Sequence, residues 1–396
     1  MRRLNLIRIA VITFFSITAS SLAQASVSVN CQKTDSRTHC DFSGSAGSNL
    51  SKQILKTLNS YPNNVTLNIL PGNYTVSPID ISDHKNIIFN LSANTTLTAV
   101  KQSDPSWEGV KALFSVRYSK NFTLSGADPQ SSIIDGRGKN WWKLSHDSRP
   151  EFIYFRNIDG LTIQGISLHN SPKYNIEVNH GSNVNIHNIL IDAPADSPNT
   201  DGINMTSVSD VSITNIQVTN GDDCIAINAD PVTEGMSNNI VFSHSTCNYG
   251  HGVSIGSNVH NTVSDVTIDH ITLNQSNNGL RIKSHCEKDD CSDTKEAVIK
   301  RVTYKNISMN GVGKPIFYDL TFDNKDDRFS LVKIKDITYD HVQATNSTIP
   351  ASFICENPNR CSPINVTSVS IDTGGVCQGV NGTNPDKTKP CPFSLD

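Results

Sequence analysis

The chain has 396 residues, with 33 Lys and Arg against 37 Asp and Glu, so its formal net charge at pH 7 is −4. An acidic chain of this kind does not bind nucleic acid non-specifically, because the phosphate backbone repels it. A polyanionic substrate would require basic side chains to be concentrated in its binding site.

The first 25 residues are predicted to be a secretory signal peptide. Three arginines precede an apolar run at residues 9–15, and Ala23-Gln24-Ala25 offers a small-x-small cleavage site. Removing this segment leaves 30 basic residues against 37 acidic ones, a formal charge of −7. We therefore expect a secreted, extracellular protein without membrane contact after signal removal, because no later stretch is long and apolar enough to span a bilayer.

A repeated pattern of apolar, x, apolar, x, x, apolar, x, apolar dominates the middle of the chain. Each half of the pattern alternates with period two, which predicts a short strand, and the two-residue gap turns a corner. Asn, Ser, Thr and Gly fill the turns, which suits tight corners. Copies begin at Leu161, Val184, Val211, Ile240, Val266, Val302 and Val332, and the copy at Ile240 is looser.

These copies stand 23 to 36 residues apart. Such a period indicates stacked units, and short strands without intervening helices favour an all-β, right-handed, single-stranded parallel β-helix. A β-sandwich is the alternative, but regularly spaced Asn-Gly hairpin turns are not seen. We expect residues 26–396 to form one catalytic domain, with residues 26–80 as an N-terminal cap and residues 362–396 as a disulfide-containing C-terminal closure.

All ten cysteines follow the predicted signal peptide. An even number of cysteines in an exported protein indicates disulfides, although sequence alone does not determine their connectivity. Pairing of near neighbours favours Cys31–Cys40, Cys224–Cys247, Cys286–Cys291, Cys355–Cys361 and Cys377–Cys391.

A further strand recurs once per coil and brings charged residues into one row. Its inward pairs are Ile176/Val178, Ile203/Met205, Ile225/Ile227, Val253/Ile255 and Leu280/Ile282. Equivalent residues of stacked coils lie about 4.8 Å apart. In the last four of these coils, the residues two positions before the inward pair are Asp201, Asp223, His251 and Asn278. The outward residues inside the same four strands are Asn204, Ala226, Ser254 and Arg281, and Lys283 is the next outward residue after Arg281.

The row predicts a glycosidase acting on an acidic sugar. Hydrolysis of a glycosidic bond needs one carboxylic acid and one carboxylate that activates water. Crowded carboxylates cannot all ionise easily, so one pKa rises and supplies the acid. Arg281 and Lys283 offer a planar fork and a point charge for a uronate carboxylate. A single Asp at such a corner is usually a solvated turn residue, but several acids in register are costly without a function.

Four motifs in this region resemble those of a known family. They are Asn199-Thr200-Asp201, Gly221-Asp222-Asp223, Gly250-His251-Gly252 and Arg281-Ile282-Lys283. In this order they are similar to the signature motifs of polygalacturonases, glycoside hydrolase family 28, and the surrounding residues resemble bacterial endopolygalacturonases most. The resemblance implies hydrolysis of α-1,4-galacturonosyl linkages in polygalacturonate or pectin, endo action, a monomer, and no metal or other cofactor.

The resemblance also implies a role for each catalytic residue. Asp222 would be the general acid, and Asp201 and Asp223 would hold and deprotonate the attacking water. His251 would maintain the protonation state of the acid. The spacing of Asp201 and Asp223 by one coil would suit a retaining enzyme, whereas the family inverts anomeric configuration, and we follow the family.

Substrate binding is assigned by the same resemblance. Arg281 and Lys283 would bind the substrate carboxylate, and Asn199 would contact substrate or orient Asp201. Tyr318, which alternates with Ile316, is expected to face the core and not the substrate.

Two further motifs are set aside. Gly252-Val253-Ser254-Ile255-Gly256 matches the nucleophile-elbow pattern, but it lies on a repeat strand and not on a strand–turn–helix unit. His285, Asp289 and Asp290 lie beside Cys286 and Cys291, and a disulfide-closed loop is favoured there over a metal site.

Other functions remain open at this stage. Within the same family they are an exo-polygalacturonase and a rhamnogalacturonan or xylogalacturonan hydrolase. A calcium-dependent pectate lyase is disfavoured because its mechanism gives the acid–histidine row no role. A non-catalytic β-helix that binds glycans is allowed by the fold alone.

Overall fold

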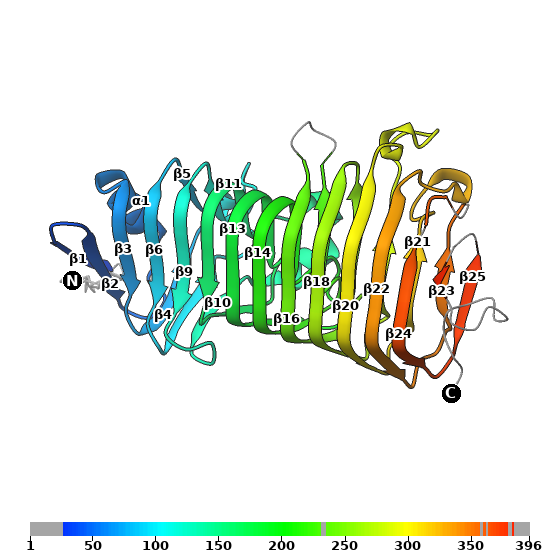
Figure 1. Cartoon of the computed structure of the whole chain (residues 1–396). Helices are drawn as coiled ribbons and strands as arrows, with labels where there is room; N and C mark the ends of the chain where they lie inside the picture. The colour runs from blue at the N-terminus through cyan, green and yellow to red at the C-terminus, as the bar shows by residue number, and fades with distance from the viewer. Residues whose placement is uncertain (1–26, 231–234, 357–358, 362, 379–381, 384–396) are drawn as a thin grey trace, which may run out of the picture.

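The computed structural model describes residues 27–230, 235–356, 359–361, 363–378 and 382–383. The predicted signal peptide and Cys391 lie outside these residues. Within them the chain winds into one elongated right-handed parallel β-helix, with its N-terminal and C-terminal strands at opposite ends (Figure 1). The predicted fold class is therefore confirmed, and no helix among the described residues is long and apolar enough to cross a membrane.

The N-terminal end differs from the rest of the molecule. Strands β1 (Val27–Lys33) and β2 (Thr38–Gly44) form an antiparallel pair, after which β2 pairs in parallel with β3 (Asn63–Ile69). Helix α1 (Ser51–Ser60) lies between β2 and β3 in the chain and buries Ile54 and Leu58. The regular coils begin inside the segment expected to be the cap, because β3 already pairs in parallel with the next coil.

The first coils are built from short strands that pair in parallel with the coil before and after. Their bounds are β4 (Gly72–Val76), β5 (Ile79–Ser82), β6 (Lys85–Leu91), β7 (Thr95–Ala99), β8 (Ala112–Arg117), β9 (Lys120–Gly126) and β10 (Ser132–Asp135).

Later coils combine long strands, which bend around the corners of the coil, with short ones. These are β11 (Glu151–Gln164), β12 (Ser167–His169), β13 (Ile176–Asp192), β14 (Ile203–Asn220), β15 (Ile225–Ala229), β16 (Ser237–Tyr249), β17 (Val253–Val259), β18 (Thr262–Asn274), β19 (Asn278–Lys283), β20 (Val298–Asn310) and β21 (Lys314–Asp319). The described part ends with β22 (Lys333–Thr345), β23 (Ala351–Ile354), β24 (Ile364–Ile371), β25 (Gly375–Gln378) and β26 (Gly382–Thr383).

The interior is a continuous apolar stack, because each coil places the same alternating positions inward. Leu161, Val184, Val211 and Ile240 are register partners on successive coils, as the repeat predicts. Corners are formed by asparagines with positive φ whose side chains bond to the coil before. For example, Asn86 donates to Asn64 at 2.8 Å, and Asn121 donates to Asn86 at 2.8 Å.

The predicted register is wrong for the last copy of the repeat. Val302 pairs with Ile337 and not with Val332. The pattern starting at Ile337 continues to Val342 and Ala344, so two overlapping sets of apolar residues match the same spacing. The structure selects the second set, in which Tyr339 stacks on Tyr304 with ring centroids 5.0 Å apart.

Four of the five expected disulfides are present, and the fifth, Cys377–Cys391, lies partly outside the described residues. Cys31–Cys40, Cys224–Cys247, Cys286–Cys291 and Cys355–Cys361 are bonded.

Candidate active site

The second strand register predicted from sequence is correct. Ile203 pairs with Ile225, Ile225 with Val253, and Val253 with Leu280. The residues two positions earlier therefore occupy the same edge of successive coils. This register carries Asp201, Asp223 and His251 to one side of the β-helix, where they line a cleft of about 630 Å³ together with Asn199, Asp222, Arg281 and Lys283.

Asp223 is almost fully buried in the wall of the cleft. Its Oδ1 accepts hydrogen bonds from the Ser254 hydroxyl at 2.7 Å and from Arg281 Nη2 at 2.9 Å, and its Oδ2 accepts one from Lys283 Nζ at 2.9 Å. All four side chains are buried. Arg281 and Lys283, predicted to face a substrate carboxylate, thus bind a carboxylate of the chain itself.

Asp222 is more accessible than Asp223. Its Oδ1 lies 2.9 Å from His251 Nδ1 and also accepts the backbone N–H of Asp223 at 2.8 Å. Asn199 Nδ2 donates to Asp222 Oδ2 at 3.4 Å. Asn199 is held in turn by Arg149, whose Nη2 donates to Asn199 Oδ1 at 2.5 Å. Asn199 therefore orients Asp222, whereas the resemblance implied that it would contact substrate or orient Asp201.

Asp201 is buried and has few compensating contacts. Asn204 Nδ2 donates to Asp201 Oδ2 at 3.1 Å. Burial, followed by the negative charges of Asp222 and Asp223, raises the pKa of the Asp201 carboxyl well above its ordinary value. In the free protein, Asp201 is therefore the acid that favours the protonated form.

The pKa of Asp222 moves in the opposite direction. Burial alone would raise it, but the hydrogen bond and positive charge of His251, with the charge of Lys283, outweigh burial and lower the pKa of Asp222. The expectation that crowding raises one pKa holds, but the raised pKa belongs to Asp201 and not to the residue expected to be the acid.

The site does not fit a metal ion. Asp222, Asp223 and His251 present ligand atoms within 4.8 Å of one another, and no other such group was found in the described part of the chain. However, Arg281 and Lys283 already donate to both oxygens of Asp223, and two fixed positive charges at that distance repel a cation. The chain itself supplies the positive charge of the site.

Comparison with known proteins identifies the family. The sequence profile of glycosyl hydrolases family 28 matches residues 59–391, which include all the site residues described above. The chain belongs to glycosyl hydrolases family 28.

The relatives of this family 28 chain include plant and fungal proteins. A polygalacturonase from Cryptomeria japonica is 31% identical over 295 residues, which cover 69% of this chain and 54% of that protein, so the chain spans about half its length. A polygalacturonase from Penicillium griseoroseum is 29% identical and is covered almost end to end, 94% of this chain and 97% of that protein.

A solved structure of a bacterial protein has the same fold. The polygalacturonase from Erwinia carotovora ssp. carotovora superposes with a TM-score of 0.69 at 24% identity, covering 90% of this chain and 99% of that one. Since the matches include plant, fungal and bacterial proteins, they do not single out the expected closeness to bacterial members.

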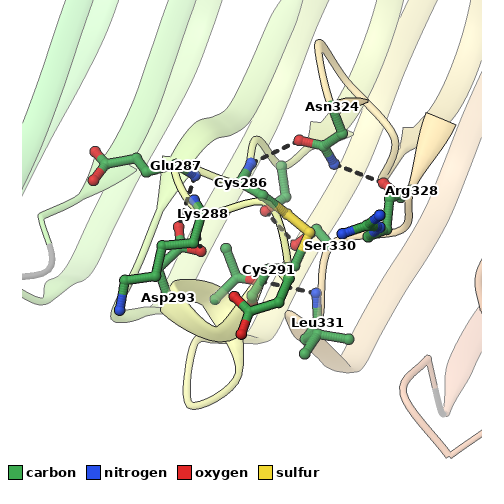
Figure 2. The surroundings of a disulfide bond; sticks show 12 residues. Cys286, Glu287, Lys288, Cys291, Asp293, Asn324, Arg328, Ser330 and Leu331 are labelled. Carbon is green, nitrogen blue, oxygen red and sulfur yellow. Dashed lines mark hydrogen bonds between the residues drawn. A yellow bond between two sulfur atoms is a disulfide. The ribbon is translucent and has the colours of Figure 1, made fainter. Parts of the chain in front are cut away.

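The C-terminal wall of the family 28 cleft is built by two loops that carry no family motif. The Cys286–Cys291 disulfide closes one loop, and Asn324 from the other accepts the backbone N–H of Cys286 at 2.7 Å (Figure 2). Glu287 reaches the cleft from the first loop, and Phe322 from the second lies against Lys283 Nζ, 4.9 Å from its ring centroid. The disulfide expected in place of a metal site is confirmed.

Two other expectations are confirmed by the strands around the site. Ser254, at the centre of the nucleophile-elbow pattern, lies within strand β17 and donates to Asp223. Tyr318 is buried in the core, as its alternation with Ile316 predicts.

Four charged residues at the N-terminal side of the cleft were not predicted. Lys111 Nζ lies 3.2 Å from Glu151 Oε1 and 3.8 Å from Glu177 Oε2, and Lys173 Nζ lies 2.6 Å from Glu151 Oε1. Glu177 is the register partner of Asn204 on the preceding coil, so the outward row of the predicted strand register could have found it. Lys111 and Lys173 lie in loops, where no repeat marks them.

Proposed function

We propose that this glycoside hydrolase cleaves α-1,4-galacturonosyl linkages in polygalacturonate, with inversion and by acid–base catalysis. The observation that carries the proposal is the arrangement of three carboxyl groups around one buried pair of cations. Asp223 neutralises only part of the positive charge of Arg281 and Lys283, because one carboxylate is bound to two cations. A substrate carboxylate that approaches the same cations would neutralise the remaining charge. The polygalacturonase names of its relatives support this substrate class.

Asp222 is proposed as the general acid, because its side chain is 16% exposed whereas that of Asp223 is 2% exposed. A sugar that covers Asp222 removes water from it, and a nearby uronate adds negative charge. Both changes raise the pKa of Asp222 and favour transfer of the available proton from Asp201 to Asp222. His251, hydrogen-bonded to Asp222, controls this step.

Asp201 and Asp223 are proposed to hold the attacking water. Once Asp201 has lost its proton it can accept one from water, and Asp223, already bound to Ser254, Arg281 and Lys283, fixes the geometry. The water oxygen then forms a bond to the anomeric carbon while the bond to the leaving oxygen breaks. Asp222 transfers its proton to that leaving oxygen.

We further propose that residues 26–396 act as one secreted, monomeric catalytic domain. Four disulfides among the described residues support an oxidising compartment. Endo action is proposed because a second hollow of about 530 Å³ continues the cleft toward the N-terminal coils and shares Lys111, Glu177 and Asn179 with it.

The product distribution over time tests this function. Incubation with polygalacturonate should release reducing ends in the presence of a chelator, with a range of oligomers appearing before the monomer. Monomer as the first and only product would replace endo with exo action. Unsaturated products that absorb in the ultraviolet would contradict hydrolysis, and release from rhamnogalacturonan alone would change the substrate.

A further inference from the structure

The four charged residues on the N-terminal side of the cleft form a second charged centre. Lys111 comes from the loop before β8, Glu151 from the start of β11, Lys173 from the loop before β13, and Glu177 from β13. Glu177, Asn204 and Ala226 are register partners on successive coils, and Ala226 lies on the coil of Asp223. Glu177 therefore lies one coil from Asp201 and two coils, roughly 10 Å, from Asp222 and Asp223.

Lys111 differs from the other cations of the cleft. Arg281 and Lys283 are buried and bound to Asp223, and Lys173 is buried and bound to Glu151. The Lys111 side chain is 52% exposed. Among the described Lys and Arg residues that line the cleft, Lys111 is thus the most exposed.

The position of Lys111 also matches an extended ligand. Lys111, Glu177 and Asn179 line both the catalytic cleft and the hollow that continues toward the N-terminal coils. A polymer chain that occupies both hollows must pass these side chains. Glu151 Oε2 and Glu177 Oε2 are both buried without a hydrogen-bond partner in the described structure, and the two carboxyl groups interact with each other beside Lys111.

We propose that Lys111, supported by Lys173, Glu151 and Glu177, forms a second carboxylate-binding subsite that takes a uronate on the N-terminal side of Asp201, Asp222 and Asp223. This inference rests on the proposed function and deepens it, because it requires an acidic sugar at a position remote from the bond that is cut. A neutral or methyl-esterified sugar at this position would lose the charge contact with Lys111.

The charge of this subsite changes near neutral pH. Burial, followed by the negative charge of Glu151, raises the pKa of Glu177 to about 7, against the opposing charges of Lys111 and Lys173. The phenols of Tyr154 and Tyr174 also face this group and stay neutral, because burial raises the pKa of each. The group thus carries one more negative charge above pH 7 than below it.

A uronate is ionised throughout this range, so its affinity for the subsite falls as Glu177 loses its proton. We expect binding of polygalacturonate to weaken between pH 6 and pH 8. Glu177→Gln removes the titrating charge, and this variant should bind as well at pH 8 as at pH 6.

Affinity electrophoresis in gels that contain polygalacturonate measures binding without turnover, and steady-state kinetics on the same polymer measures KM. Lys111→Gln should weaken retention and raise KM roughly three- to tenfold, the effect of one partly exposed charge contact. Lys111→Arg should restore most of both. Lys120→Gln is the matched control, because Lys120 is an exposed lysine paired with Asp159 outside the cleft.

The outcomes separate the subsite from the proposed function. If the wild type releases reducing ends and Lys111→Gln has the same KM and the same retention as the wild type, the subsite is overturned and the proposed function stands. Retention that depends on Lys111 without any release of reducing ends would overturn the function and keep the subsite. Equal retention of Lys111→Gln and wild type on highly methyl-esterified pectin is expected, and an equal loss on both polymers would show that the substitution acts through the fold.

Discussion

Two regions of one cleft combine carboxylates with cations and differ in where the cations point. At the proposed catalytic centre Arg281 and Lys283 both bind Asp223, so Asp201 and Asp222 compete for one proton. At the second centre the two lysines share Glu151, and Lys111 remains half open to solvent. The first arrangement keeps a proton on Asp201 beside Asp222, whereas the second leaves the ammonium group of Lys111 available to bind an anion.

The comparison shows that burial and partner geometry decide what a charged residue does. Lys283 and Lys111 are both cleft lysines within 4 Å of a carboxylate. Lys283 is buried and bound to Asp223, so its removal should affect folding as well as activity. The Lys111 side chain is about half exposed, so its removal should affect binding more than folding.

The largest expected effect is a loss of kcat without a loss of stability. Asp222→Asn should lower kcat by about 10²- to 10⁴-fold, because an amide cannot transfer a proton to the leaving oxygen. Thermal unfolding should stay close to that of the wild type. Asp289→Asn, an exposed aspartate outside the cleft, is the matched control and should keep full activity. A fully active Asp222→Asn enzyme would remove Asp222 from the role of acid.

A smaller effect should appear in stability when the buried ion pair is broken. Lys283→Met leaves Asp223 with Arg281 as its remaining cation, and we expect a loss of about 3 kcal/mol in the free energy of unfolding at pH 7, measured by urea denaturation. The double variant Asp223→Asn with Lys283→Met should recover part of that loss. An unchanged free energy of unfolding in Lys283→Met would mean that the contact between Lys283 and Asp223 does not stabilise the fold.

The smallest effect is a gain in stability. The pKa of Asp201 is raised in the folded protein, so the unfolded chain ionises first, and stability contributed by the neutral carboxyl is lost as pH rises from about 4 toward the folded pKa. Asp201→Asn should therefore raise Tm by about 2–4 °C at pH 7 and leave it nearly unchanged at pH 3.5. A lower Tm at pH 7 would show that Asp201 is stabilised as the anion.

Much of the architecture was predictable from local patterns. The recurrence of Ile203, Ile225, Val253 and Leu280 once per coil predicted the register that groups the acids. This register is well defined because a slip by one residue would turn every side chain to the other face. Helix α1 was missed, although Leu50, Ile54 and Leu58 repeat every four residues and all are buried. The last repeat was placed wrongly because two overlapping apolar sets satisfy the same spacing.

The sequence by itself determined the coil, the stacking order and the set of acids and cations at the proposed catalytic centre, because a β-helix converts a one-dimensional repeat into a row at a constant rise. Only the tertiary structure decided which carboxyl keeps the proton, that Asp223 takes both buried cations, and that Lys111 meets Glu177 from an irregular loop. These outcomes depend on burial and on distances between side chains of different coils, which no spacing along the chain encodes.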